Sequence, residues 1–103
     1  MSKYHSKPII IDNVRFHSQK EARRYSDLKV LLQAGRIEDL HLQPRFPLFV
    51  KEKLICTYVA DFEYYSHDSV KWIVEDVKGV RTKEYQIKRK LFEALYPWKI
   101  LET

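Results

Sequence analysis

Two strand-like segments between residues 58 and 79 carry acidic side chains in apolar surroundings, and they restrict the fold more than any other part of the chain. Asp61 lies in the first segment within Val-Ala-Asp-Phe, and the second segment, residues 71–79, reads KWIVEDVKG. Side chains two apart on a strand share a face, so Asp76 and Lys78 point the same way, about 6.6 Å apart. An acid and a base are costly to bury in an apolar strand without compensation. A divalent metal and a phosphate would supply it.

Length and composition predict a single folded domain over residues 1–103. The chain is 45% hydrophobic and 14% aromatic, which favours a buried core over disorder. A net charge of +5 suits a polyanionic partner. The single cysteine, Cys56, excludes an intrachain disulfide and fits a reducing cytoplasm. We expect a cytoplasmic protein, since neither a signal peptide nor a run of about 18 apolar residues is visible.

Turn and cap signals predict the order of the elements. Residues 8–16 fit a hairpin that turns at Asp12-Asn13. A helix is expected from Ser18, where Ser-Gln-Lys-Glu fits a capping box, to the residue before Gly35. The remaining expected elements are strands over 37–42, 48–50, 54–65 and 70–77, a helix from Thr82 to about Leu95, and a strand over 98–101. This order predicts an α/β (α+β) fold with a mixed central sheet flanked by two helices.

Glu21 is an acidic candidate in the first predicted helix. It shares one helical stripe with Tyr25, Leu28 and Leu32, so it is expected to point inward. One interpretation is a capping glutamate that reaches back to Ser18. The other is a functional acid that faces the same core as the strand carboxylates, and the two roles can coexist.

The strand acids also allow structural interpretations. Asp61 could end a strand and accept hydrogen bonds from backbone donors, and Asp76 could form a structural ion pair with Lys78. The apolar neighbours of Asp76 favour a buried strand, which raises the weight of a functional role. Glu75 points to the opposite face from Asp76, and we assign it to solvent or to structure.

Basic residues follow the Asp-Val-Lys triplet. Lys88 lies in the apolar stripe of the second predicted helix and could extend to the surface, reach the acidic site or bind a phosphate. Arg81, Lys83, Arg89 and Lys90 could form an ordinary solvated face. Because they follow directly on the acidic strand, we favour a phosphate-binding face.

These motifs together resemble the PD-(D/E)xK nuclease superfamily. The match comprises Glu21 in the first helix, Asp61 in Ala-Asp-Phe, and the Asp-Val-Lys-Gly of residues 76–79. The predicted order of helices and strands (α-β-β-β-α-β), with its small N-terminal hairpin, also resembles the restriction-endonuclease-like core of that superfamily. Ala60 stands where the superfamily has a proline, which removes no ligand.

A wider pattern is similar to small endonuclease-like proteins encoded by phages, and to Holliday-junction-resolvase-like proteins. It runs from F-x-S-x-x-E-A-x-x-Y at residues 16–25, through Gln43-Pro44, to VEDVKG at residues 74–79. The resemblance therefore spans nearly the whole chain, and the order of its short motifs carries most of its weight. A phage-encoded protein of this kind would act in the cytoplasm of the bacterial host.

The resemblance implies a metal-dependent endodeoxyribonuclease that hydrolyses phosphodiester bonds. Asp61, Asp76 and the backbone carbonyl of Val77 would hold Mg²⁺ or Mn²⁺, which prefer hard oxygen ligands. Glu21 would bind a second ion or its water, and Lys78 would orient the attacking water and stabilise developing charge. The DNA-binding candidates are then Arg81, Lys83, Lys88 and Arg89. The superfamily implies 5′-phosphate and 3′-hydroxyl products.

The size of the chain bears on substrate and partners. Because no spare domain is present to read a base sequence, we expect cleavage of branches or junctions in phage recombination, replication or packaging. Paired incisions at a junction favour a homodimer, formed through residues 37–50 or the N-terminal hairpin. Two alternatives stay open, a non-catalytic nucleic-acid-binding module on the same fold and a nuclease subunit of a larger recombination or transposition complex.

Overall fold

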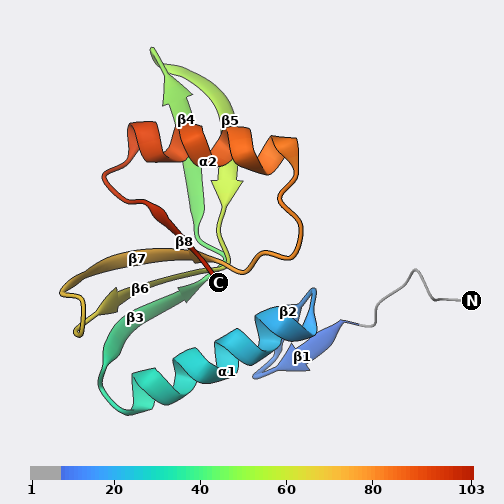
Figure 1. Cartoon of the computed structure of the whole chain (residues 1–103), viewed down its shortest axis with the longest axis vertical. Coiled ribbons are helices and arrows are strands. Elements are labelled where there is room, and N and C mark those ends of the chain that lie inside the picture. The colour runs from blue at the N-terminus through green and yellow to red at the C-terminus, as the bar shows by residue number, and fades with distance from the viewer. Residues whose placement is uncertain (1–7) are drawn as a thin grey trace, which may run out of the picture.

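A computed structural model describes residues 8–103 and has the mixed architecture that the sequence predicts. In chain order its elements are β1 (Ile9–Ile11), β2 (Val14–Phe16), α1 (Gln19–Gln33), β3 (Ile37–Leu42), β4 (Arg45–Val50), β5 (Lys53–Val59), β6 (Phe62–Ser66), β7 (Lys71–Asp76), α2 (Lys83–Leu95) and β8 (Ile100–Glu102). A four-stranded sheet has the order β3-β6-β7-β8, in which only β7 and β8 run parallel (Figure 1). The pairs β1–β2 and β4–β5 form separate hairpins.

Different elements pack against the two faces of the four-stranded sheet. On one face, Phe62 and Tyr64 of β6 pack with Leu28 of α1. On the other, Val74 of β7 packs in a second cluster with Phe92 of α2, and this cluster includes residues of the β4–β5 hairpin. Figure 1 shows α1 on one side of the sheet and α2 with that hairpin on the other. Successive residues of β7 therefore enter two different cores.

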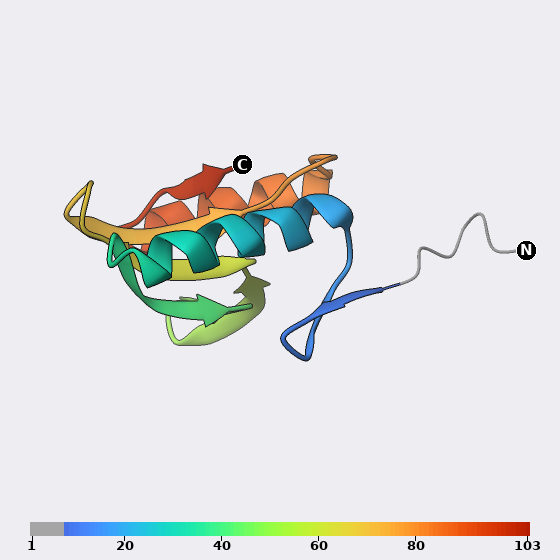
Figure 2. The ribbon, with the colours of Figure 1, turned by 90° about the horizontal axis from the view of Figure 1, so that it is seen from below.

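Local signals account for the start of the chain. Asp12 and Asn13 both have positive φ angles, 53° and 64°, which match the tight hairpin turn that joins β1 to β2. This hairpin packs beside the N-terminal half of α1 (Figure 2), and Asp12 in its turn accepts hydrogen bonds from Tyr25 and Lys29 of that helix. Ser18 caps α1 by accepting a hydrogen bond from the backbone N–H of Glu21, at 3.1 Å. Leu32, expected on the inward stripe of α1, is instead exposed.

The strand predicted over residues 54–65 is in fact two strands. The chain breaks at Ala60-Asp61, between β5 and β6. Ala60 N–H donates to the carbonyl of Pro44 before the hairpin, whereas Asp61 N–H donates to the carbonyl of Glu75 in β7. The segment thus exchanges one partner strand for another at Asp61, which an alternating apolar pattern does not reveal.

No helix within residues 8–103 is both long and apolar enough to cross a membrane.

Candidate active site

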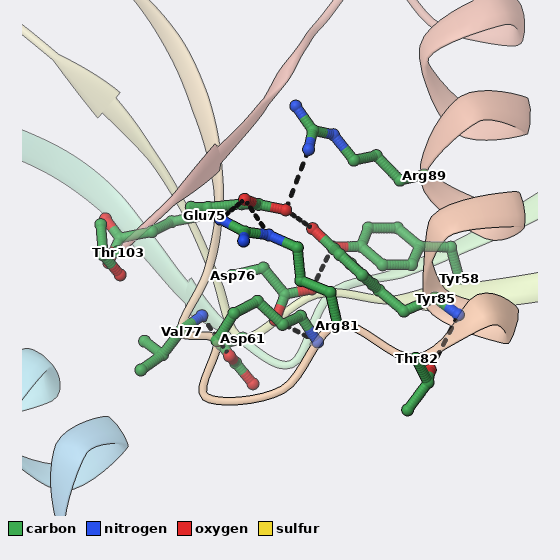
Figure 3. Close-up of polar contacts among 12 residues, drawn as sticks. Tyr58, Asp61, Glu75, Asp76, Val77, Arg81, Thr82, Tyr85, Arg89 and Thr103 are labelled. Carbon is green, nitrogen blue, oxygen red and sulfur yellow. Dashed lines mark hydrogen bonds and ion pairs between the residues drawn. The ribbon is translucent and has the colours of Figure 1, made fainter.

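Asp61 and Asp76 meet where β6 begins and β7 ends. Asp61 directly precedes β6, Asp76 is the last residue of β7, and the two segments run side by side. Asp76 is only 2% exposed and Asp61 is partly buried. Figure 3 shows the two side chains close together beside Val77. The structure therefore brings together the two aspartates that the sequence selects.

Asp76 has a partner for each carboxylate oxygen. The Tyr58 hydroxyl donates to Oδ2, and Lys78 Nζ lies 3.0 Å from Oδ1. Lys78 Nζ also lies 4.0 Å from the ring centroid of Tyr85, within the range of a cation–π interaction. The lysine side chain is 23% exposed, so its ammonium group is held beside Asp76 at the edge of solvent.

Asp61 combines a backbone contact with an unfavourable electrostatic environment. Its Oδ2 accepts a hydrogen bond of 2.7 Å from the backbone N–H of Val77. Burial, the adjoining Asp76 carboxyl and Glu21 together raise the pKa of Asp61 to about 7, against the opposing effect of the Val77 N–H. The structural interpretation of Asp61 thus holds for one oxygen. Burial is the main reason for its raised pKa, and the neighbouring acids add to it.

Glu21 lies in the first turn of α1 and is 8% exposed. Burial is the main reason that its pKa is raised; Asp76 raises it further, whereas His17 and Lys78 lower it. The charges of both Asp76 and Lys78 therefore influence the protonation of the Glu21 carboxyl group. Ser18 caps the helix by accepting from the Glu21 backbone N–H, but within residues 8–103 no hydrogen bond returns from the Glu21 carboxylate to Ser18, so the capping interpretation of the glutamate side chain is not supported.

Two of the basic residues around α2 form ion pairs with an acid at the end of β8. Arg81 Nη2 lies 2.6 Å from Glu102 Oε1, and Arg89 Nη1 lies 3.0 Å from Glu102 Oε2. The Tyr85 hydroxyl donates to the same carboxylate at 2.7 Å. Figure 3 shows Arg89 extending from α2 toward this cluster. Two of the predicted DNA-binding cations are thus already paired with an acid.

Within residues 8–103, neither Lys88 nor Lys83 forms an ion pair with Asp61 or Asp76. Lys88 Nζ is 3.8 Å from Glu84 one turn earlier in α2, so the structure does not bring it into the acidic site. Lys83 is exposed at the start of α2. Lys78 is therefore the lysine that contacts the strand acids.

Glu75, on the opposite face of β7, is a fully buried acid with many partners. Arg24 of α1 contacts both of its oxygens, at 2.6 Å and 2.9 Å. The hydroxyls of Tyr64 and Thr103 donate to it at 2.6 Å and 3.0 Å. Of the two roles that the sequence allowed for Glu75, the structure supports the structural one.

Two partners of the site were not found from the sequence. Tyr58 reaches Asp76 from the β4–β5 hairpin, and burial and the Asp76 contact raise its pKa. Tyr85 covers Lys78 from α2. No local pattern marks Tyr58, whereas the position of Tyr85 on the apolar stripe of α2 is a signal that it points inward.

Metal binding can be judged from the oxygen donors. Within residues 8–103, no group of three or more His, Cys, Asp or Glu side chains is gathered for a metal ion. Asp61 and Asp76 do form a neighbouring carboxylate pair. Mg²⁺ is commonly held by one or two carboxylates, with waters and phosphate oxygens completing the shell. The donor set thus fits such an ion, with Lys78 as a competitor for Asp76.

The comparison with known proteins gives a match to a family whose description names no function. A family model described as "Protein of unknown function (DUF1064)" matches residues 1–101. No curated protein and no solved structure matches the chain.

Proposed function

This chain belongs to the DUF1064 family, and we propose that it is a metal-dependent endodeoxyribonuclease. The observation that carries the proposal is the junction of β6 and β7, where Asp61 and Asp76 adjoin and Lys78 contacts Asp76 at 3.0 Å. A structural ion pair would need only Asp76 and Lys78. The additional crowding of Asp61 and Glu21 is unfavourable for the isolated protein and is explained by a function that brings in positive charge.

The strand order supports the further inference of a restriction-endonuclease-like core. Omitting the β4–β5 hairpin as an insertion leaves the order α1-β3-β6-β7-α2-β8, with three antiparallel strands and a parallel fourth. This is the α-β-β-β-α-β order expected for the PD-(D/E)xK superfamily. The acids also lie on the elements expected from that resemblance.

The proposed cofactor is Mg²⁺ or Mn²⁺. Asp61, Asp76 and the Val77 carbonyl would hold one ion, and Glu21 would hold a second ion or a bound water. When bound, the ion would lower the pKa of water and neutralise charge on the scissile phosphate.

The protein residues would position and stabilise the reacting groups. Tyr58 fixes the orientation of the Asp76 carboxylate through its hydrogen bond. The ammonium group of Lys78 has three N–H donors, so its contact with Asp76 leaves donors for a phosphate oxygen or a water. In a partly buried site such a fixed positive charge stabilises negative charge that develops on the phosphate.

Branched DNA is the proposed substrate, cut by a symmetric dimer. A non-catalytic DNA-binding module is the main alternative, but buried acids disfavour phosphate and would not improve simple binding. The third possibility, activity only within a larger complex, predicts an inactive isolated chain.

A metal titration distinguishes these functions. Labelled four-way junction, blunt duplex and single-stranded DNA are incubated with the full chain in EDTA, Mg²⁺ or Mn²⁺. The proposal predicts cleavage that requires the metal and prefers the junction. Binding without cleavage in either metal would favour the non-catalytic module or the complex-dependent subunit.

A further inference from the structure

A groove of about 750 Å³ lies at the other end of β7 from Asp76. β8 pairs with β7 only from Val74 onward, where Val74 lies opposite Ile100. The start of β7 and the segment 97–99 therefore diverge, and the groove occupies the space beside them. This geometry leaves a recess next to Trp72 that the proposed active site does not use.

The lining of the groove combines aromatic rings with positive charge. Tyr65, Trp72 and Trp98 line it, and the rings of Tyr65 and Trp72 meet edge to face with centroids 5.6 Å apart. Trp72 is 38% exposed, which is unusual for so large an apolar side chain. Lys71 and Lys99 are exposed, and no Asp or Glu is among the lining residues.

We propose that this groove binds single-stranded nucleic acid. Bases would stack on Trp72 and its neighbouring rings, while Lys71 and Lys99 would contact phosphates, the combination found in sequence-independent single-strand binding. A duplex presents no free base faces, so it gains no stacking here. A second copy of the groove would bring lysine toward lysine, so charge complementarity favours a polyanion.

The proposal rests on the proposed nuclease function, which it deepens by giving a place to bind to the single strand of a flap or a fork, the branched substrates that have an unpaired arm. Trp72 and Asp76 are four residues apart on β7, about 13 Å. Val74 between them is fully buried beneath α2, so a strand cannot follow the sheet face. A strand that reached Asp76 from the groove would instead have to pass the edge strand β8, where Glu93 of α2 accepts a hydrogen bond from Ile100 N–H and lines a hollow with Arg89 and Lys90.

The tryptophan content allows a direct test. The chain has two tryptophans, and both line the groove, so its tryptophan fluorescence reports on this region. The full chain is titrated in EDTA with a fluorescein-labelled oligothymidine, and quenching and anisotropy are recorded together. We expect saturable quenching with the same midpoint as the anisotropy change.

Two sets of variants locate the binding. Trp72→Leu should weaken binding about tenfold, or roughly 1.4 kcal/mol, through lost stacking. Trp72→Phe should recover most of the affinity. Phe49→Leu is the matched control, because Phe49 is 48% exposed on the β4–β5 hairpin, outside the groove lining.

A second set of variants reverses the charge of the groove lysines and leaves the aromatic rings unchanged. Lys71→Glu with Lys99→Glu should weaken binding and reduce the slope of log affinity against log salt by about 1.4, or ~0.7 per contact. Lys51→Glu with Lys53→Glu makes the same change in net charge at exposed positions of the hairpin and should have a much smaller effect.

The outcomes separate this inference from the proposed function. Unchanged oligothymidine affinity in both groove variants overturns the inference, even if the wild type cleaves DNA with Mg²⁺. So does a fluorescence change that follows protein concentration and not oligonucleotide, since a second copy then occupies the groove. Groove-dependent binding by a protein that cleaves no DNA supports the inference and counts against the nuclease.

Discussion

Neighbouring residues of β7, Glu75 and Asp76, place a buried carboxylate on each face of the same strand, and the two carboxylates differ in the number of partners that compensate their charge. Glu75 accepts two hydrogen bonds from Arg24 and one each from Tyr64 and Thr103. Among the residues that the structure describes, Asp76 has Lys78 and Tyr58 as side-chain partners, and it helps to raise the pKa of two other acids, Asp61 and Glu21. Burial alone therefore does not identify a functional acid.

The useful distinction is how completely each charge is compensated. A buried charge with a bidentate arginine and two hydroxyl donors has its acceptor sites largely filled. A group of acids that shares one lysine is under-compensated and gains from an added cation. Function is expected on the under-compensated face, and stability on the other. The following predictions test that division.

The largest effect is expected on catalysis. Asp76→Asn or Lys78→Ala should reduce Mg²⁺-dependent DNA cleavage by about a thousandfold or more, because the first removes a proposed metal ligand and the second removes positive charge beside the scissile phosphate. DNA affinity should stay within about tenfold. Single-turnover cleavage and anisotropy measure the two quantities. Asp68→Asn is the control, since Asp68 is an exposed aspartate paired with Arg36. Near wild-type cleavage by Asp76→Asn would refute the assignment.

A large loss of stability is expected on the opposite face. Arg24→Ala leaves the Glu75 carboxylate buried without its main partner and should lower the free energy of unfolding by about 3 kcal/mol. Arg23→Ala, one residue earlier and exposed, should change it by less than about 0.5 kcal/mol. Urea denaturation measures both. A similar small change in the two variants would mean that the Glu75 cluster is not stabilising.

A smaller gain of stability is expected on the under-compensated face. Without metal, Asp76→Asn removes one of the crowded charges at nearly constant shape and should raise the free energy of unfolding by on the order of 1 kcal/mol. Mg²⁺ should stabilise the wild type more than the variant, because binding is linked to folding. Thermal melting in EDTA and in excess Mg²⁺ provides the measurement. A variant that melts lower in EDTA, with equal gains from Mg²⁺, would make Asp76 a structural partner of Lys78.

The smallest effect concerns Glu102, a compensated acid at the end of β8. Hydrogen bonds from Arg81 and Tyr85 lower the pKa of Glu102 to about 2. A lowered pKa means that this stabilisation is complete above the ordinary pKa of 4.5 and is lost as the pH falls from 4.5 toward 2. Glu102→Gln should flatten the fall in stability over that window, whereas Glu52→Gln in the exposed β4–β5 turn should not. Denaturation at several pH values between 3 and 6 tests this, and parallel curves for both variants would contradict it.

The features predicted correctly from the sequence are those with local causes. Ser18 and Thr82 cap the helices as expected, because a side-chain oxygen before a helical stripe acts within three residues. The turn at Asp12-Asn13 is equally local. The convergence of Asp61 and Asp76 followed from strand periodicity and from a family resemblance, and the structure brings the two together.

The features that the sequence did not predict depend on partners far along the chain. Arg24 and Glu75 are 51 residues apart, and Tyr58 and Asp76 are 18 apart. Nothing near Glu75 shows that a helix will supply its arginine. In the same way, the pairing of Arg81 and Arg89 with Glu102 depends on the last strand returning beside β7.

The β4–β5 hairpin joins the rest of the chain at the acidic site. Gln43 N–H, just before the hairpin, donates to the carbonyl of Asp61, just after it, at 2.9 Å. The base of the hairpin is thereby closed, and Tyr58 near that base reaches Asp76. The Lys51-Glu52 turn at the other end is exposed. The hairpin thus behaves as a module: its tip can be lengthened, shortened or labelled by protein engineering without altering the carboxylates, whereas its root cannot be replaced without rebuilding them.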